Sequence, residues 1–306
     1  MKKVILASRG SRLALAQTEM VRDGLMAANE GLQTDLIIIQ TKGDKILDVP
    51  LAKVGGKGLF VKEIEEALLD KRADIAVHSL KDVPAELPQG LMLGACLVRE
   101  TPFDALVSEK YASLRDLPDG AKVGTSSLRR ACQLKAIRPD LEILSLRGNV
   151  ETRLRKLNSE GFDAIVLAAA GLNRLGLEDR ITELLVAPDF VPAVGQGIVV
   201  VECREDDQEI KDLLLNLEHA STRLAMRAER AFLATMGGGC QVPLGAYAEI
   251  KNSKIHMVGM VGHPDGSQIH KEKMVGSLTA PETLGIALAN ALLDCGGAEI
   301  LRELTA

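Results

Sequence analysis

The sequence has 306 residues, a length that favours two or three domains over one. Hydrophobic residues make up 46% and charged residues 26%, which excludes fibrous and disordered classes and is typical of a soluble globular protein. The net charge of −5 argues against a chain-wide electrostatic grip on nucleic acid or on an anionic membrane, so any anion site has to be local. With aromatic residues at 2%, platforms that stack single-stranded bases are not expected.

The cysteines and the apolar runs indicate where the protein works. Five cysteines occur without any C-x-x-C pair, which predicts neither a disulfide framework nor a zinc site. No second histidine stands at ligand spacing from His78, so no metal is expected. No uninterrupted apolar stretch reaches the ~18 residues of a membrane span, and the N-terminus carries no targeting pattern. We expect a cytoplasmic protein.

The first predicted element is a strand at residues 4–7, followed by the polar turn Ser8-Arg9-Gly10-Ser11 and by a helix whose apolar residues recur at helical spacing. The same plan returns about 118 positions later. There a strand at 121–123 leads into the turn Gly124-Thr125-Ser126-Ser127 and a helix over 128–137, which Pro139 closes.

A second internal match is tighter. Residues 61–77 align with residues 150–166 at a constant offset, and both segments read as a helix with an apolar stripe followed by a buried strand. The two strands run into loops at 78–82 and 169–173. The sequence therefore predicts two α/β lobes of similar plan.

The first lobe carries extra chain relative to the second, much of it in the segment 41–58. This segment holds four Gly, four Lys and a Pro. Long loops of this kind in compact domains are usually lids or disordered, so the composition predicts a mobile cover over a cleft.

The last third of the chain changes character. A β-run at 198–202 and helical patterning at 207–235 precede three short strands and a closing helix, expected at 246–250, 255–261, 269–275 and 281–293. The predicted fold class is thus α/β, with two α/β lobes and a small α+β C-terminal domain. The expected domains are residues 1–98 with 198–217 for lobe 1, 99–197 for lobe 2 and 218–306 for the C-terminal domain.

A local excess of positive charge interrupts this acidic chain. Between residues 124 and 156 there are eight Lys or Arg against three acids. Arg129 and Arg130 lie at a predicted helix start, where free N–H groups also favour anions, and Arg9 and Ser11 occupy the matching turn of the first lobe. Guanidinium groups suit carboxylate or phosphate, so the pattern predicts a polyanion pocket. Solvated helix faces are the alternative for any single arginine.

Two further positions are candidates for chemistry. Lys81 and Asp82 follow a strand, and ligands bind at the carboxyl ends of strands in open α/β sheets; an exposed salt pair is an equal alternative. His78 is interpreted as a packed or capping residue. Cys240 follows three glycines that leave its thiol unobstructed, but no histidine nearby would activate it, so from the residues alone an incidental cysteine is favoured. Residues 55–58 lack the spacing of a P-loop, and nucleotide binding is not supported.

Seven blocks of residues, in this order, resemble the porphobilinogen deaminase family over nearly the whole chain. The blocks are Ser8-Arg9-Gly10-Ser11, His78 to Pro84, Gly124 to Arg130, Leu146 to Val150 with Arg153, Val194 to Gly197, Glu229-Arg230 and Gly238-Gly239-Cys240.

The resemblance implies a transferase that joins four porphobilinogen molecules head to tail, with release of ammonia, to form hydroxymethylbilane. It implies a fold similar to two-lobed periplasmic binding proteins with a small added domain. It also implies a dipyrromethane cofactor attached by a thioether to Cys240, which reverses the interpretation from the residues alone. A monomer that passes its product to uroporphyrinogen-III synthase completes the expectation.

By position in these motifs, the resemblance implies a role for each candidate residue. Asp82 matches the catalytic carboxylate, which also contacts the cofactor. The other implied cofactor contacts are Lys81, Ser127, Arg129 and Arg130. The implied substrate contacts are Arg9, Ser11, Arg147, Arg153 and Arg174.

Two other functions share parts of this pattern. A non-catalytic two-lobed anion-binding protein would have the same lobes and arginine turns but no use for Cys240. A thiol hydrolase would use Cys240 as its nucleophile, without any pyrrole adduct.

Overall fold

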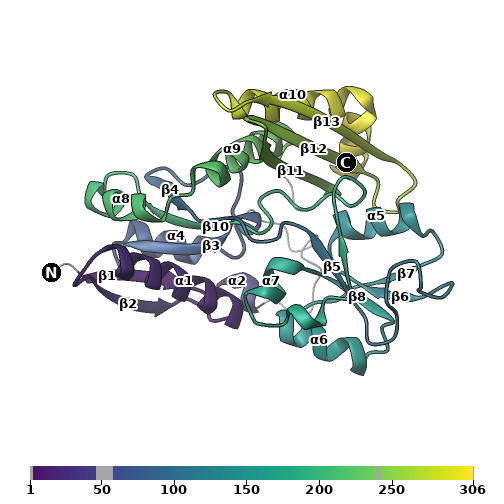
Figure 1. The fold of residues 1–306 in the computed structure, drawn as a ribbon, viewed down its shortest axis with the longest axis horizontal. Helices are drawn as coiled ribbons and strands as arrows, with labels where there is room; N and C mark the ends of the chain where they lie inside the picture. The colour runs from purple at the N-terminus through teal and green to yellow at the C-terminus, as the bar shows by residue number, and fades with distance from the viewer. Residues whose placement is uncertain (1–2, 46–57, 239–241, 306) are drawn as a thin grey trace. The chain divides into compact units, whose positions relative to one another are not determined.

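The computed structural model describes residues 3–45, 58–238 and 242–305 (Figure 1). The chain divides into two compact units, residues 1–100 with 197–223 and residues 101–196 with 224–306. Each unit is described by itself. Three β-sheets with helices on their faces confirm the predicted α/β class.

The first unit is built on a five-stranded sheet of order β2-β1-β3-β10-β4. Strand β1 is parallel to β2 and β3, whereas β10 runs antiparallel to β3 and β4. The strands are β1 (Lys3–Ser8), β2 (Gln33–Ile38), β3 (Ile75–Ser79), β4 (Leu91–Cys96) and β10 (Val199–Arg204). The helices are α1 (Arg12–Ala28), α2 (Lys42–Lys45), α4 (Lys62–Leu69), η1 (Leu80–Asp82), α8 (Gln208–Leu214) and η3 (Leu215–Leu217).

Alternating strand residues of this sheet point to opposite faces and pack into two separate hydrophobic cores. On one face, Ile75 and Val77 pack with Val21 of α1 and Ile210 of α8. On the other face, Ala76 packs under α4. The sheet is therefore covered on both sides, as its parallel portion requires.

The second unit contains a sheet of order β7-β6-β8-β5-β9, in which β5 is the antiparallel strand. Its strands are β5 (Asp104–Val107), β6 (Lys122–Gly124), β7 (Glu142–Leu144), β8 (Ala164–Ala168) and β9 (Glu183–Leu185). Its helices are α5 (Leu128–Ile137), α6 (Val150–Ser159), α7 (Ala169–Asn173) and η2 (Glu178–Arg180). The two five-stranded sheets have the same arrangement. In each, the strand that precedes the first polar turn of the lobe (β1 or β6) lies between two parallel strands, and an antiparallel strand (β10 or β5) and then an edge strand (β4 or β9) follow on one side. The internal repeat predicted from the sequence is confirmed.

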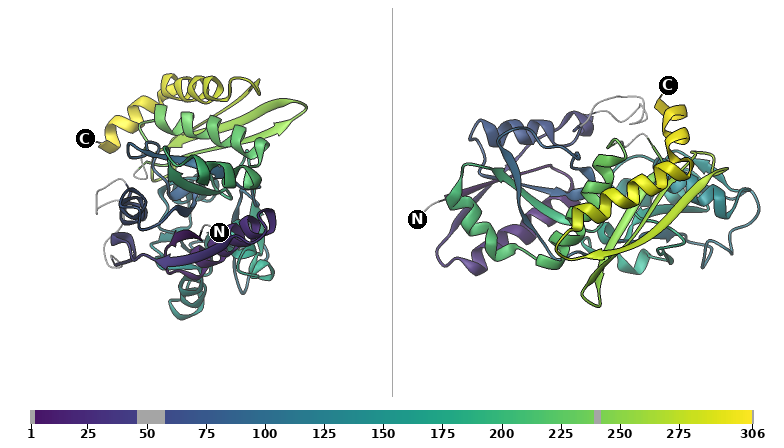
Figure 2. Two further views of the ribbon diagram at one scale, coloured as in Figure 1. Left: turned by 90° about the vertical axis from the view of Figure 1, so that its left-hand side faces the viewer. Right: turned by 90° about the horizontal axis from the view of Figure 1, so that it is seen from above.

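The same unit carries an antiparallel sheet of β11 (Leu244–Lys251), β12 (Lys254–Gly262) and β13 (Ile269–Ser277). Helix α9 (Ala220–Thr235) begins in the first unit and ends in the second. Figure 2 shows α10 (Pro281–Leu292) lying across β12 and β13. The three strands and α10 lie where the sequence predicts them.

The chain after α10 is helical again, which the sequence did not predict. A π-helical turn, η4 (Leu293–Gly297), leads into α11 (Ala298–Thr305). Gly296 has φ 109°, which places a kink between the two helical segments. The stretch Pro281–Leu304 is long and apolar enough to cross a membrane by length and composition. Leu288 and Leu292 are nevertheless fully buried in the core of the C-terminal sheet, so we interpret it as a core helix.

The predicted mobile cover at 41–58 is only partly within the described residues. Thr41 is buried and residues 42–45 form α2, so the beginning of this segment is helical rather than structureless. Residues 46–57 lie outside the described residues.

Candidate active site

One cleft of the first unit gathers several residues from the ends of β1 and β3. Ser11 ends the turn after β1 and caps α1, because its hydroxyl accepts a hydrogen bond from the backbone N–H of Ala14 at 3.2 Å. Arg9, Ser11, Ser79 and Asp82 all line this cleft. The structure thus brings together three of the residues expected at the site, one from the acid motif and two from the first turn.

The carboxylate of Asp82 is exposed at the end of the short helix η1, which continues β3. It accepts no hydrogen bond and forms no ion pair with the residues that the structure describes. A carboxylate in this state is available for a positively charged or N–H-bearing ligand. The neighbouring Lys81 is half-buried.

Arg9 is held by two residues that the sequence did not single out. Its Nε lies 3.1 Å from Oδ1 of Asp44 on α2, and its guanidinium lies 4.3 Å from the centre of the Phe60 ring. Burial alone would raise the pKa of Asp44, but Arg9 and Thr41 outweigh it and lower that pKa. The ion pair therefore orients the guanidinium toward the cleft edge. No periodicity or motif links positions so far apart, so only the fold reveals this pair.

Buried hydrogen bonds fix the strand residues next to the cleft. The Gln17 amide donates to the Ser79 hydroxyl at 2.9 Å, and His78 Nε2 lies 3.1 Å from Oε2 of Glu202 on β10. His78 is 5% exposed, which confirms its interpretation as a packed residue. Burial, and secondarily the charge of Glu202, raises the pKa of the nearby Glu65 to about 7. His78, Glu65 and Glu202 thus form a buried polar cluster at β3, the strand that leads into η1 and Asp82.

In the second unit, the first turn of α5 carries two buried arginines. Ser127 caps α5 by accepting a hydrogen bond from the backbone N–H of Arg130 at 3.4 Å. Arg129 is 5% exposed and Arg130 is 6% exposed. Both guanidiniums donate to the fully buried Asp104, with Arg129 Nη1 and Arg130 Nη2 each 2.7 Å from one of its oxygens.

This arginine pair leaves positive charge unbalanced. Two guanidiniums face one carboxylate, and they hold the pKa of Asp104 well below its usual range although burial would raise it. Among the described residues, Nε and Nη2 of Arg129 make no hydrogen bond. Burying an excess charge is costly unless a counter-charge is supplied. A ligand bearing several carboxylates, such as the dipyrromethane expected from the sequence, fits this donor set.

The expected substrate contacts of the second unit lie on its other strand ends. Arg147 is half-buried in the turn after β7, and Arg153 on α6 donates from Nε to the carbonyl of Gly148 at 2.8 Å. Arg174 follows α7 and is half-buried. Arg147 is thus positioned by the turn after β7, whereas Arg153 and Arg174 are positioned by the helices α6 and α7 that follow β7 and β8.

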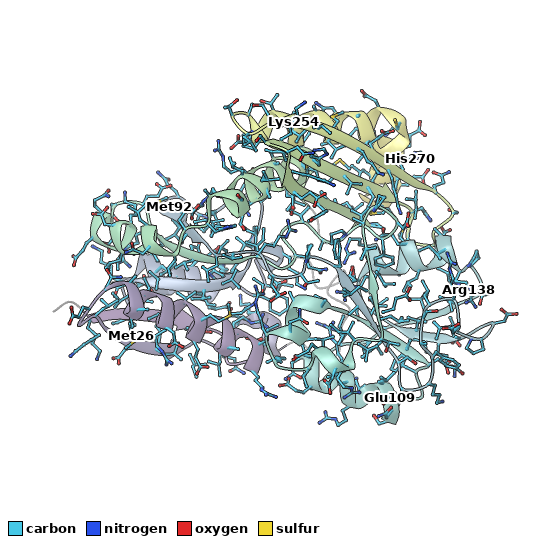
Figure 3. All side chains as sticks on the ribbon, in the orientation of Figure 1. Met26, Met92, Glu109, Arg138, Lys254 and His270 are labelled. Atoms are coloured by element: carbon cyan, nitrogen blue, oxygen red, sulfur yellow. The ribbon has the colours of Figure 1, made fainter. Side chains whose placement is uncertain are left out.

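Other cations of the basic region have structural roles. Arg138, labelled in Figure 3, donates to backbone carbonyls including that of Leu117 at 3.1 Å, and pairs with Asp140 at 2.7 Å. Lys156 pairs with Glu160 at 3.1 Å along α6, and Arg155 is exposed. The count of charges along the sequence therefore overstated the positive charge open to a ligand.

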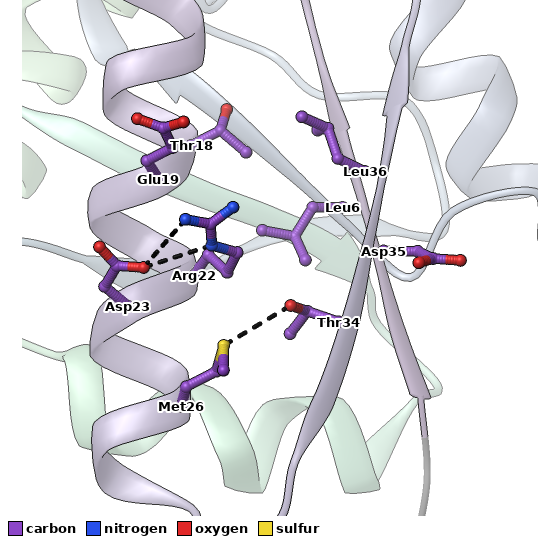
Figure 4. Close-up of a pocket in the computed structure, with 9 residues that line it drawn as sticks. All are labelled: Leu6, Thr18, Glu19, Arg22, Asp23, Met26, Thr34, Asp35 and Leu36. Carbon is purple, nitrogen blue, oxygen red and sulfur yellow. Dashed lines mark hydrogen bonds and ion pairs between the residues drawn. The ribbon is translucent and has the colours of Figure 1, made fainter.

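A second hollow of the first unit lies between α1 and β2 (Figure 4). It combines apolar side chains such as Leu6 and Leu36 with the exposed ion pair between Arg22 and Asp23, at 3.2 Å. None of the residues expected at the site lines it. Cys240, the expected cofactor attachment point, lies outside the described residues.

Comparison with solved structures finds distant two-lobed proteins. The periplasmic VFT2 domain of BvgS from Bordetella pertussis matches with 17% identity, 70% of this chain, 85% of that chain and a TM-score of 0.41. The methionine binding protein MetQ matches with 14% identity, 70% of this chain, 89% of that chain and a TM-score of 0.46. A YaeC-family lipoprotein from Enterococcus faecalis matches with 14% identity over 72% of this chain and 92% of that chain, with a TM-score of 0.44. Likenesses of this size carry no argument about function.

Comparison with protein-family models is decisive. The model described as "Porphobilinogen deaminase, dipyromethane cofactor binding domain" matches residues 4–212, and that described as "Porphobilinogen deaminase, C-terminal domain" matches residues 223–294. The first match contains the cleft with Asp82 and the arginine pair, and the second begins within α9. The chain therefore belongs to the porphobilinogen deaminase family, the transferases that condense porphobilinogen into hydroxymethylbilane with a dipyrromethane cofactor.

Proposed function

We propose that Asp82 is the catalytic carboxylate of this transferase and that Arg9 and Ser11 hold the incoming porphobilinogen beside it. The observation that carries the proposal is the single cleft lined by these three residues in a chain that both family models match. We further propose Arg147, Arg153 and Arg174 as substrate contacts of the second lobe: Arg147 lies in the turn after β7, Arg153 in the first turns of α6 and Arg174 at the end of α7. The carboxylate arms of porphobilinogen suit guanidinium forks.

The proposed cofactor contacts are Lys81, Asp82, Ser127, Arg129 and Arg130, with Cys240 as the point of covalent attachment. When bound, dipyrromethane supplies the pyrrole carbon to which the first substrate is joined. The net positive charge of the Arg129, Arg130 and Asp104 cluster supports this assignment, because the cofactor's carboxylates would neutralise it.

Asp82 acts on charge in the chemical step. The C–N bond of the protonated substrate aminomethyl group breaks, its electron pair leaves with ammonia, and the positive charge passes to the substrate pyrrole. The Asp82 carboxylate, which forms no hydrogen bond or ion pair with the described residues, can accept a hydrogen bond from the pyrrole N–H and stabilise this positive charge. Electrostatic stabilisation of this kind contributes about 10²–10³-fold to rate.

Three further properties belong to the proposal. The domains are residues 1–98 with 198–217, 99–197 and 218–306. The protein works as a cytoplasmic monomer, and its linear tetrapyrrole passes to uroporphyrinogen-III synthase, because a linear product needs an enzyme that closes the ring. Light scattering of the purified protein tests the monomer against its 32.8 kDa chain mass.

The first experiment is the intact mass of the purified protein. An adduct of two pyrrole units supports the transferase with its attached cofactor. A bare chain that turns nothing over but binds anionic ligands would favour the two-lobed binding protein. Alkylation-sensitive hydrolysis without an adduct would favour the thiol hydrolase.

The second experiment is the variant Asp82→Asn. We expect it to keep its fold and its cofactor adduct, because the side chain is exposed and unpaired among the described residues, and to lose roughly 10²-fold or more in kcat. Asp70→Asn, at an exposed position after α4, is the matched control and should keep wild-type turnover. A near-normal rate in Asp82→Asn would refute the assigned role.

A further inference from the structure

Strand β11 of the C-terminal sheet lies directly on the arginine pair of the second unit. A Cβ added to Gly245 would lie 2.9 Å from Cδ of Arg129 and 2.5 Å from the carbonyl oxygen of Pro192. No ordinary side-chain carbon makes contacts this short to backbone, so only glycine allows this approach. The backbone of Gly245 does not have the left-handed φ that would by itself require glycine. Space alone selects the residue.

The groups that Gly245 touches also hold Arg129. The carbonyl of Val191, 3.2 Å from the same added Cβ, accepts hydrogen bonds from Arg129 Nη1 at 2.7 Å and from the Gln133 amide at 3.0 Å. Gln133 in turn accepts a hydrogen bond from the backbone N–H of Val191 at 2.7 Å. A displacement at Gly245 would therefore move both the Arg129 stem and the acceptor that fixes its guanidinium.

A second contact joins the C-terminal sheet to the same cluster. The fully buried carboxylate of Glu229 on α9 accepts hydrogen bonds from the backbone N–H of Ala248 on β11, at 2.8 Å, and of Gly195, at 2.6 Å. The next residue, Gln196, donates from its amide to Asp104 at 3.0 Å. Glu229 thus fixes the loop at Gly195 and Gln196, and Gln196 contacts Asp104, the carboxylate that both arginines bind.

We propose that Gly245 and Glu229 are positioning residues that set the place of Arg129 and of its partner Asp104 from the C-terminal sheet. The inference rests on the proposed function, in which Arg129 holds a cofactor carboxylate. Since Cys240 stands between α9 and β11 in the sequence, the same two contacts link the elements that flank the attachment point to the arginines that grip the cofactor.

The test is Gly245→Ala, with Gly259→Ala as the matched control. An alanine at 259 on β12 would crowd Phe232, Leu288 and Leu292 in the core of the same sheet, so it strains that sheet away from Arg129. Both variants should unfold at lower temperature than the wild type. Per cofactor-loaded molecule, Gly245→Ala should lose about tenfold in kcat with KM within twofold, because the misplaced group is the cofactor, and the substrate contacts lie elsewhere. Gly259→Ala should keep the wild-type kcat.

Glu229→Gln is the second variant, since it adds no atoms if Gly245→Ala fails to fold. It replaces one acceptor by a donor facing backbone N–H groups, and the same loss of kcat at constant KM is expected. Wild-type kcat in loaded Glu229→Gln or loaded Gly245→Ala would overturn the proposal. So would an equal loss in Gly259→Ala.

A double-mutant cycle separates this inference from the proposed function. Urea midpoints of Gly245→Ala, Arg129→Ala and the double variant should be non-additive, because removing Cδ and the guanidinium relieves the crowding at Gly245 and frees the carbonyl of Val191. Additive midpoints would overturn the coupling even if the wild type carries its cofactor. A wild type without any pyrrole adduct would instead overturn the proposed function, while the cycle still decides the coupling.

Discussion

Individual side chains of this protein owe their roles to burial and to the charges beside them. Asp82 and Glu65 are both carboxylates of the first unit, yet one is exposed in the cleft and the other lies under the sheet. The exposed carboxylate is accessible to a ligand, whereas burial and the neighbouring charge of Glu202 raise the pKa of Glu65 to about 7. Two chemically similar residues therefore serve stability and function in different ways.

Glu65 makes the stability of the first unit depend on pH. Its pKa is raised to about 7 from an ordinary 4.5, so between these values the folded state binds more protons than the unfolded state. Stability contributed by the protonated group is complete below about pH 4.5 and is lost as the pH rises through 7. We expect Glu65→Gln to remove this loss and to raise the free energy of unfolding by about 1–2 kcal/mol at pH 8.

Urea unfolding at pH 5 and at pH 8 measures this effect. The gain in Glu65→Gln should be present at pH 8 and small at pH 5. Glu19→Gln, at an exposed position of α1 that does not contribute to the pKa of Glu65, is the control and should change stability little at either pH. An equal effect of the two substitutions would contradict a specific role of burial.

Helix N-caps and turn glycines fix the backbone positions of the candidate residues. Ser11, Ser127 and Asn149 are each the N-cap of a helix whose first turn lies beside candidate arginines. A helix start of this kind orients neighbouring cations and leaves N–H groups toward an anion. Sequence motifs at such starts therefore carry both a folding signal and a binding signal.

The turn between β7 and α6 shows how one glycine can control a binding element. Gly148 has φ 119°, and an added Cβ would lie 2.6 Å from Cγ2 of Thr152, while its carbonyl accepts from Arg153. Gly148→Ala should displace Arg147 and Arg153, which we assign to the substrate, and raise KM about tenfold, since such strain is worth about 1–3 kcal/mol.

Gly161→Ala is the control for this substitution. Gly161 follows the C-terminal end of α6, has φ 71° and has nothing within 4 Å of the added Cβ. It should lose stability through backbone strain but keep the wild-type KM. Steady-state kinetics of both variants decide the matter, and an unchanged KM in Gly148→Ala would contradict the assigned role of this turn.

Across the chain, the cofactor is expected to stabilise the fold that binds it. The cluster of Arg129, Arg130 and Asp104 buries a net positive charge, which the cofactor's carboxylates would balance. Cys240→Ser, which cannot form the thioether, should therefore unfold roughly 3–8 °C below the loaded wild type, since 1 kcal/mol corresponds to about 2–4 °C in domains of this size. Differential scanning calorimetry measures the shift. Equal unfolding temperatures of the loaded and unloaded proteins would count against the arginine pair as the cofactor's anchor.

The sequence by itself was sufficient for the two repeated lobes, the three C-terminal strands, the turns that carry Arg9 and Arg129, and the family. Periodicity, helix caps and turn residues are properties of neighbouring positions, so they can be read without the fold. Two of the family motifs lie in these same turns.

The partners of those residues became visible only in the folded chain. Arg129 and Asp104 are 25 positions apart, Arg9 and Asp44 are 35 apart, and Gly245 meets Arg129 from a different sheet. Such pairs are made by strands and helices that meet after folding, and spacing along the chain holds no record of them. For that reason the sequence could indicate which arginines are candidates for binding anions but not which carboxylates and which glycine contact them.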